Sequence, residues 1–258
     1  MVGKRFISFG CSYTGYVTAT WADYIGANFE QYYNFGQGGA SNVFIMNRFM
    51  EIDNLLKFNK DDYIIVMFTN SERFSYRDST NWKHGGNLYV NPDMPEIFLE
   101  KIWSTEWSIY QSWISMITVK KILTLKNIKH KILTSMDNSH LFQYVLNNDV
   151  VTTYLNDTVD LLDVKQAMAW WTKEKYDIND FNKYKNSESI DTHPTQKMHY
   201  EYIKEHFPEF DTEKTKDRYN LSETAIDMSS MENQYQTFAN VIQKPYNKAF
   251  LLNELIFL

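Results

Sequence analysis

The sequence predicts an α/β protein in which a parallel sheet is covered by helices on both faces. Short strand-like runs alternate with stretches of helical periodicity from the start of the chain. The run at 62–69 (DYIIVMFT) is almost continuously apolar, as expected for a strand that is buried on both faces. Alternating strands and helices of this kind build a parallel sheet between two layers of helices.

Each element can be placed in chain order. Strands are expected at residues 4–9, 31–35, 62–69 and 129–135. Helical spacing falls at 21–29, after a Ser41 cap, within 96–125, and from Pro194 to about residue 207, because proline is well tolerated at the first position of a helix. Residues 71–95 and 138–180 are polar or irregular and are interpreted as an insertion loop and a second insertion.

These elements are assigned to one domain, residues 1–210, followed by a C-terminal extension, residues 211–258. The extension starts with a polar linker and closes with FLLNELIFL, in which seven of nine residues are apolar. That segment is too short to span a bilayer. We expect residues 245–258 either to fold back on the domain or to dock on a second copy or another subunit of an assembly.

Composition narrows the class of partner. A net charge of -6 argues against nucleic acid, which is bound through clustered Lys and Arg. The one cysteine, Cys11, excludes an internal disulfide and gives no support to a thiolate metal site. No signal peptide or membrane span is visible, so the protein is expected to be cytoplasmic when synthesised. The 18 Tyr, 17 Phe and 7 Trp suit a core, a sugar cleft or an interface equally well.

Polar residues follow the predicted strands at the edge where parallel sheets bind ligands. Acyl transfer needs a nucleophile, a base and N–H donors for the oxyanion. Ser12, expected at the start of a helix after the first strand, supplies the nucleophile and a free backbone N–H, and His193 supplies the base. Gly39 can offer its N–H without a Cβ in the way, and Asn70 can offer its side-chain NH2.

Four fragments resemble those of the SGNH (GDSL-like) hydrolases, and two of them look like the versions in phage-encoded members. They are FGCSYT (9–14), NFGQGGASN (34–42), FTNS (68–71) and DTHPTQKMH (191–199). The resemblance implies a flavodoxin-like three-layer α/β/α sandwich and an esterase without a cofactor. It also implies a catalytic triad and an oxyanion hole, which fall on Ser12, Asp191 and His193 and on the N–H groups of Ser12 and Gly39 with Asn70.

The sequence departs from the family pattern at three points. Cys11 replaces the usual Asp of Gly-Asp-Ser, and Asn70 lies in Phe-Thr-Asn-Ser where Gly-x-Asn-Asp is usual. The usual Asp-x-x-His is shortened, so that Ile190 occupies the expected acid position. Asp191 can orient the imidazole from a tighter loop, and Glu188 or a backbone carbonyl are the alternatives.

The expected reaction is hydrolysis of an O-acyl ester, most plausibly an O-acetyl group on a sugar. Candidates for substrate contact are Arg73, Trp82, Trp170 and Trp171, with packing in the core or on the surface as the more common role for each Trp. The main alternative is a non-enzymatic one, a hydrolase fold used as a structural or carbohydrate-binding component of a larger assembly such as a virion.

Two further interpretations of the motifs are disfavoured. A dinucleotide fingerprint would need a third glycine where Ser41 stands, and no acidic ribose partner follows. A metal site would need clustered ligands, whereas His193 and His199 are six residues apart and would lie on different faces of a helix.

Overall fold

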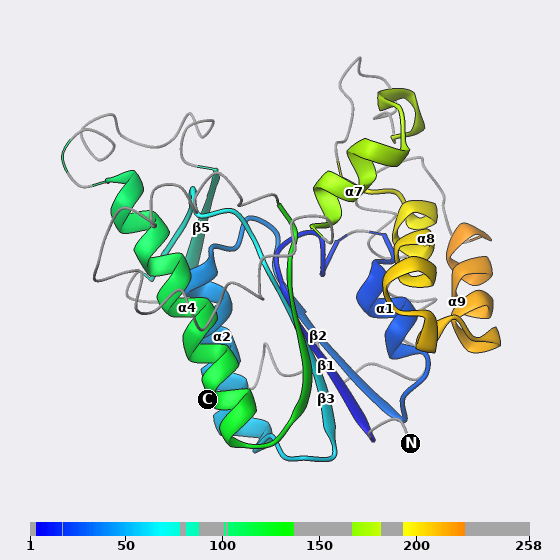
Figure 1. The fold of residues 1–258 in the computed structure, drawn as a ribbon, viewed down its shortest axis with the longest axis horizontal. Helices are drawn as coiled ribbons and strands as arrows, with labels where there is room; N and C mark the ends of the chain where they lie inside the picture. Colours follow the sequence, from blue (N-terminus) through cyan, green and yellow to red (C-terminus); the bar gives the residue numbers. More distant parts are fainter. Residues whose placement is uncertain are drawn as a thin grey trace.

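A four-stranded parallel sheet forms the centre of the molecule, which confirms the predicted fold class (Figure 1). The computed structural model describes residues 4–16, 18–77, 81–87, 101, 103–136, 167–181 and 193–224, without the side chains of residues 170 and 178. The strand order is β2-β1-β3-β6. The strands are β1 (Arg5–Gly10), β2 (Gln31–Gly36), β3 (Asp62–Phe68) and β6 (Lys129–Thr134), all close to their predicted positions.

The register of the sheet brings the ends of three strands together. Gly10, the last residue of β1, lies beside Gly36 of β2 and Met67 of β3. Every residue of β3 is buried, as its apolar sequence predicted. The residues that follow β1, β2 and β3 therefore meet at one edge of the sheet, where parallel sheets bind their ligands.

Helices cover both faces of the sheet (Figure 1). On one face lie α2 (Asn42–Leu56) and α4 (Thr105–Leu125), and on the other lie α1 (Trp21–Gly26), α8 (Gln196–His206) and α9 (Glu213–Thr224). Ser41 caps α2 as predicted, because its hydroxyl accepts the N–H of Phe44 at 3.3 Å. None of the described helices is both long and apolar enough to cross a membrane.

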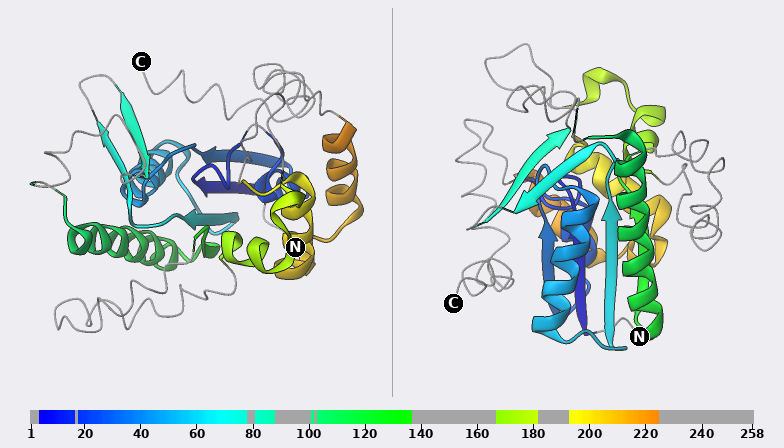
Figure 2. Two further views of the ribbon diagram at one scale, coloured as in Figure 1. Left: turned by 90° about the horizontal axis from the view of Figure 1, so that it is seen from above. Right: turned by 90° about the vertical axis from the view of Figure 1, so that its left-hand side faces the viewer.

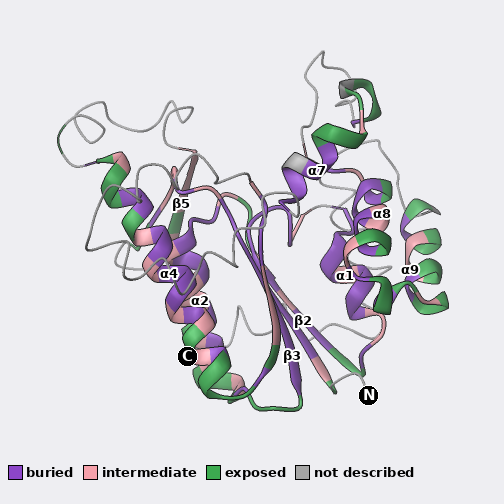
Figure 3. Cartoon of the chain, in the orientation of Figure 1, coloured by how far each residue is buried: buried purple, intermediate pink, exposed green. Residues whose placement is uncertain are grey.

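Many of the aromatic residues of the chain lie in the hydrophobic core. Phe6, at the centre of the sheet, stacks on Phe29 and Tyr32 with ring centroids 5.2 and 5.4 Å apart. Buried residues follow the sheet and the inner sides of the helices, and exposed residues follow their outer sides (Figure 3). Among the described residues, most of the tyrosines and phenylalanines of this sheet thus serve packing, one of the three uses that composition left open.

Residues 71–95 are not simply a loop, contrary to the sequence interpretation. They include an antiparallel hairpin of β4 (Arg73–Arg77) and β5 (Trp82–Asn87). A bulge between Phe74 and Ser75 shifts the register opposite the glycines of β5, which hid the strand pattern. The hairpin lies beyond the carboxyl ends of the sheet strands, as the right-hand view of Figure 2 shows.

Two predicted helix starts are wrong. Ser12 does not begin a helix but lies in a turn, and the first helix, α1, begins only at Trp21. The helix expected from Pro194 begins at Gln196, because the hydroxyl of Thr195 accepts the N–H of Met198 at 3.3 Å and makes Thr195 the N-cap. The proline thus precedes the cap instead of opening the helix.

Packing continues past residue 210, where the sequence suggested a domain boundary. Thr215 of α9 is fully buried and its hydroxyl accepts a hydrogen bond from the Asn28 side chain at 2.8 Å. The Tyr24 and Ser222 hydroxyls are hydrogen-bonded at 3.0 Å. Residues 211–224 therefore pack with the preceding domain. Residues 225–258, with the expected docking segment 245–258, lie outside the described residues.

The second insertion contains α7 (Met168–Lys175) and the short 3-10 turn η4 (Ile178–Asp180). A second 3-10 turn, η5 (Pro208–Phe210), follows α8. The N–H of Ala169 donates to the carbonyl of Ser135 at 2.8 Å, directly after β6. This bond places the first turn of α7 at the carboxyl edge of the sheet. Residues 137–166 are not described.

Candidate active site

Ser12 lies in a tight turn that follows β1. The N–H groups of Thr14 and Gly15 both donate to the carbonyl of Cys11, at 2.9 and 3.0 Å, and close the turn around Ser12. The carbonyl of Thr14 accepts from the side chains of Thr20 and Asn34 at 2.6 and 2.8 Å. The turn is therefore fixed by hydrogen bonds at both of its ends.

Close contact with β2 also holds the turn in place. A Cβ added to Gly15 would lie 2.8 Å from the carbonyl carbon of Gly36, and one added to Gly36 would lie 2.8 Å from the Cα of Gly15. Both distances are too short for real atoms. Only glycine at these two positions lets the Ser12 turn pack directly on the end of the neighbouring strand.

His193 lies against Ser12. Its Nε2 is 2.8 Å from the Ser12 Oγ, although the two residues are 181 positions apart in the chain. The imidazole is stacked on Tyr16, with centroids 4.2 Å apart and ring planes at 17°, and Tyr13 contacts it at 5.6 Å. The two tyrosines limit the orientations that the ring can take. Their position in the same turn as Ser12 was the available sequence signal, and the sequence interpretation missed it.

A second histidine joins the helices that follow the two loops of the site. His199 of α8 is buried, and its Nδ1 accepts the N–H of Trp21, the first residue of α1, at 3.2 Å. Burial, and to a smaller extent the neighbouring His193, lowers the pKa of His199 to about 3. His199 is therefore neutral and acts as a hydrogen-bond acceptor that joins α8, which follows His193, to α1, which follows Ser12.

The backbone N–H groups of Ser12 and Gly39 have no hydrogen-bond acceptor within the described residues. Gly39 has φ +74°, a conformation that favours glycine, in the loop that follows β2. Asn70 follows β3, and its side-chain NH2 donates to the Asn87 Oδ1 at 3.1 Å, which leaves its second hydrogen for another acceptor. The three predicted oxyanion donors thus follow three neighbouring strands at the same edge of the sheet.

The hairpin β4–β5 positions two of these donors, which the sequence interpretation did not foresee. Asn87 of β5 holds the Asn70 side chain, and a Cβ on Gly39 would lie 3.3 Å from the His84 Cβ. Ser75 of β4 accepts the N–H of Ser41 at 3.0 Å and is hydrogen-bonded to the His84 Nδ1 at 3.1 Å. The segment expected to be a loop is therefore a support for the loop of Gly39 and for Asn70.

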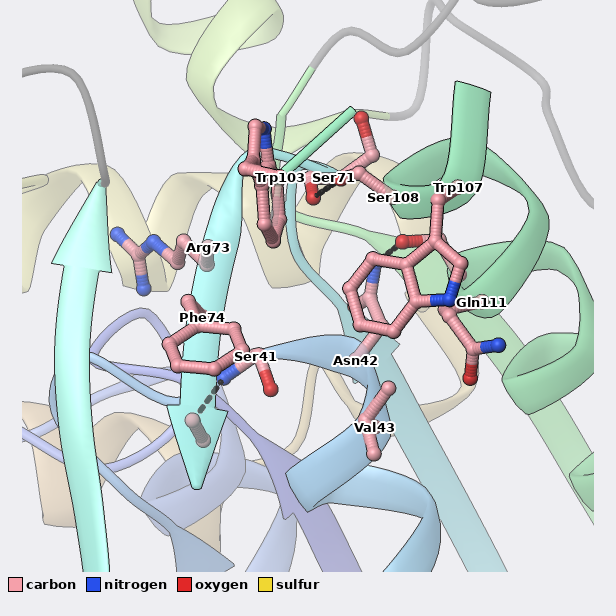
Figure 4. Close-up of a pocket in the computed structure, with 12 residues that line it drawn as sticks. Ser41, Asn42, Val43, Ser71, Arg73, Phe74, Trp103, Trp107, Ser108 and Gln111 are labelled. Carbon is pink, nitrogen blue, oxygen red and sulfur yellow. Dashed lines mark hydrogen bonds between the residues drawn. The ribbon is translucent and has the colours of Figure 1, made fainter. Parts of the chain in front are cut away.

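A small pocket with a volume of about 100 Å³ lies between α2, α4 and β4 (Figure 4). Ser41 and Ser71, which directly follow the Gly39 loop and Asn70, form one side of it. Trp103 and Trp107 form another, with their ring centroids 5.6 Å apart. Trp107 is 45% exposed, so that an aromatic face is open to solvent beside the pocket.

The four predicted substrate contacts lie in different places. Arg73 is among the residues that line the pocket. Trp82 packs edge-on against Phe44 of α2 at 5.3 Å, and Trp171 is buried against Tyr202 of α8, so both are packing residues in this structure. Trp170 belongs to α7, but its side chain is outside the described part of the structure.

The expected acid, Asp191, and its alternative, Glu188, also lie outside the described residues, and so does Ile190. His193 has an interaction beyond the contacts given above. In the part of the chain that is described, no three His, Cys, Asp or Glu side chains are grouped so that they could hold a metal ion.

No family model matches this sequence, and no curated protein is similar to it. Among solved structures, the chain is similar to a catalytic mutant of Axe2, an acetylxylan esterase from Geobacillus stearothermophilus, and to another Axe2 mutant described as an acetyl-xylooligosaccharide esterase. Each is 13% identical, with a TM-score of 0.47, over 82% of this chain and 96% of the other.

Proposed function

We propose that this protein is a serine esterase that hydrolyses an O-acyl ester, with Ser12 as nucleophile and His193 as base. The observation that carries the proposal is the 2.8 Å distance between the Ser12 Oγ and the His193 Nε2. A hydroxyl that is hydrogen-bonded to a positioned imidazole, next to unbonded N–H groups, is the arrangement that acyl transfer needs.

The first half of the reaction transfers the acyl group to the enzyme. The Ser12 Oγ attacks the carbonyl carbon of the ester while its proton passes to the His193 Nε2. The oxyanion that forms would accept hydrogen bonds from the N–H groups of Ser12 and Gly39 and from the Asn70 side chain. Collapse of this intermediate breaks the bond to the alcohol oxygen, which takes the proton from His193.

The second half returns the enzyme to its starting state. Water gives a proton to His193 and attacks the acyl carbon, and the Ser12 Oγ leaves with the proton from His193 as the carboxylic acid is released. One ester and one water thus give one alcohol and one acid. Asp191 is the proposed orienting acid on the other nitrogen of His193, with Glu188 as the alternative.

A sugar carrying an acetyl group is the substrate that we favour. The pocket between α2, α4 and β4 has a volume of about 100 Å³ and is lined by Trp103, Trp107 and Phe74. The half-exposed Trp107 offers a flat apolar surface on which the C–H face of a pyranose ring can pack. The small volume suits a short acyl group better than a fatty chain.

The experiment is to measure turnover of 4-nitrophenyl acetate and of an acetylated oligosaccharide by the wild-type protein and three variants. Ser12→Ala and His193→Ala should each lower kcat by about 10⁴-fold or more, and the double variant should lose little further, because the pair acts as a unit. His130→Ala is the matched control, since His130 lies in the first half of β6, toward the opposite edge of the sheet.

Turnover that persists in Ser12→Ala would refute the mechanism. A wild-type protein that binds the oligosaccharide but hydrolyses neither ester would instead favour the alternative role, a carbohydrate-binding component of a larger assembly.

A further inference from the structure

Arg73 lies on the face of the hairpin that holds the proposed oxyanion donor Asn70. In the register of β4 and β5, Arg73 is directly opposite Asn87. Side chains that are directly opposite in an antiparallel pair extend to the same face. The Asn87 side chain on that face accepts the hydrogen bond from Asn70 at 3.1 Å. The Arg73 side chain is therefore directed to the same side of the hairpin as Asn70.

Arg73 also lines the pocket, together with its neighbour in the strand, Phe74. Phe74, the next residue along the strand, packs against Trp103 with ring centroids 5.8 Å apart. Figure 4 shows the guanidinium of Arg73 extending away from Trp107. The strand thus brings an aromatic side chain and a cation to the pocket, with the guanidinium on the side away from Trp107.

Arg73 is half-buried, and its guanidinium has no counter-charge within the described residues. Its Nε and Nη1 atoms are inaccessible to solvent and make no hydrogen bond. Other arginines of the chain are paired: Arg5 with the buried Asp62 at 2.6 Å, and Arg77 with Glu51 at 4.0 Å. Buried polar nitrogens without a hydrogen-bond partner are unfavourable, so such groups in proteins are normally paired or bind a ligand.

We propose that Arg73 binds an anionic group of the substrate beside the ester, so that the preferred substrate is an acylated acidic glycan. This inference rests on the proposed esterase function. A neutral sugar hydroxyl could fill a hydrogen-bonding position but would leave the charge uncompensated. The partner must bring negatively charged oxygen atoms, as the carboxylate of a uronic acid or a sulfate ester does.

The test compares kcat/KM for three O-acetylated oligosaccharides of matched length: neutral, uronate-containing and sulfated. For the wild-type protein, kcat/KM should be at least tenfold higher for one of the anionic substrates than for the neutral one. The substrate with the highest kcat/KM identifies the anion. Arg73→Gln should remove that preference, chiefly by raising KM for the anionic substrates. Arg73→Lys should keep part of the preference.

The matched control is Arg77→Gln, which removes the same charge from the same strand at a side chain that is 62% exposed. It should leave the preference intact. If the wild-type protein favours the neutral substrate, or if Arg73→Gln lowers turnover of all esters equally, the proposal is overturned. An equal loss for all esters would mean that Arg73 acts on the oxyanion or on the fold.

A binding measurement separates failure of this inference from failure of the proposed function. Titration calorimetry with the Ser12→Ala protein should show tighter binding of the anionic than of the neutral oligosaccharide, and no difference when Arg73→Gln is added. Selective binding without any turnover in the wild-type protein would refute the esterase and retain the anion site. Turnover without selective binding would refute the anion site alone.

Discussion

Acidification should destabilise this protein through His199, and the size of the effect can be worked out. In the folded protein the pKa of the His199 imidazole is lowered to about 3, mainly because burial disfavours the charged form. In the unfolded chain its pKa is close to ~6.5. The unfolded chain therefore binds more protons between these values, and stability that is fully present above about pH 6.5 is lost as the pH falls.

Linkage then gives the magnitude. From pH 7.5 to pH 5 the free energy of unfolding should fall by about 2 kcal/mol through this residue alone, and by about 4 to 5 kcal/mol once the pH is below 3. The loss at pH 5 depends almost wholly on the pKa in the unfolded chain, so long as the folded pKa is below about 4. The same acidification should loosen the contact between α1 and α8, because a protonated Nδ1 cannot accept the N–H of Trp21.

The assay is urea unfolding of the wild-type protein and of His199→Asn at pH 7.5, 6 and 5. The Asn side chain can still accept the N–H of Trp21 but does not titrate. We expect the variant to be less stable at pH 7.5, because a buried ring is lost, but to lose about 2 kcal/mol less than the wild type between pH 7.5 and 5. Contributions from other titrating groups are common to both proteins. Parallel pH dependences for the two proteins would refute the assignment of a neutral buried His199.

The remaining predictions concern the oxyanion loop, the acid and the tail. Gly39→Ala should lower kcat tenfold or more, because φ is +74° and a Cβ would press on β5 at 3.3 Å, whereas Gly38→Ala, with open space around it, should be nearly silent in the same assay. Asp191→Asn should lower kcat by about 10³-fold or more by favouring the wrong tautomer of the base. If Asp191→Asn lowers kcat by less than about tenfold and Glu188→Gln lowers it more, Glu188 and not Asp191 orients His193. Deletion of residues 245–258 should convert an oligomer to a folded monomer in light scattering, and a monomeric full-length protein that the deletion merely unfolds would contradict docking.

The sheet and the residues at its carboxyl edge could be predicted because local and global signals agree there. Residues 63–68 are apolar without interruption, which few structures other than a buried parallel strand explain. Strand ends of a parallel sheet meet at one edge, so Ser12, Gly39 and Asn70 could be assigned to that edge from the order of the strands alone. His193 was assigned to the same edge from the position of its loop, and the resemblance to a known family supported its pairing with Ser12, since no local pattern links positions 181 residues apart.

The hairpin could not be predicted, for a physical reason. Strand periodicity is visible when side chains alternate between core and solvent, but β4 and β5 form a two-stranded ribbon with a bulge, and β5 contains Gly85 and Gly86 where side chains would show the alternation. Tyr16 was missed for a different reason. A half-exposed tyrosine in a turn carries no periodic signal, and its stacking on His193 at 4.2 Å depends on a loop from the far end of the chain.

The Ser12–His193 pair and the other two oxyanion donors are held from opposite faces of the sheet. The nucleophile and base are held by the α1 and α8 face, where His199 joins the helix after Ser12 to the helix after His193. The oxyanion donors Gly39 and Asn70 are held by the α2 face and the hairpin. Substitutions in the α1–α8 contact should therefore change proton transfer and spare substrate preference. Changes in the hairpin should leave the Ser12–His193 pair intact but alter the oxyanion donors and, through Arg73, the substrate preference.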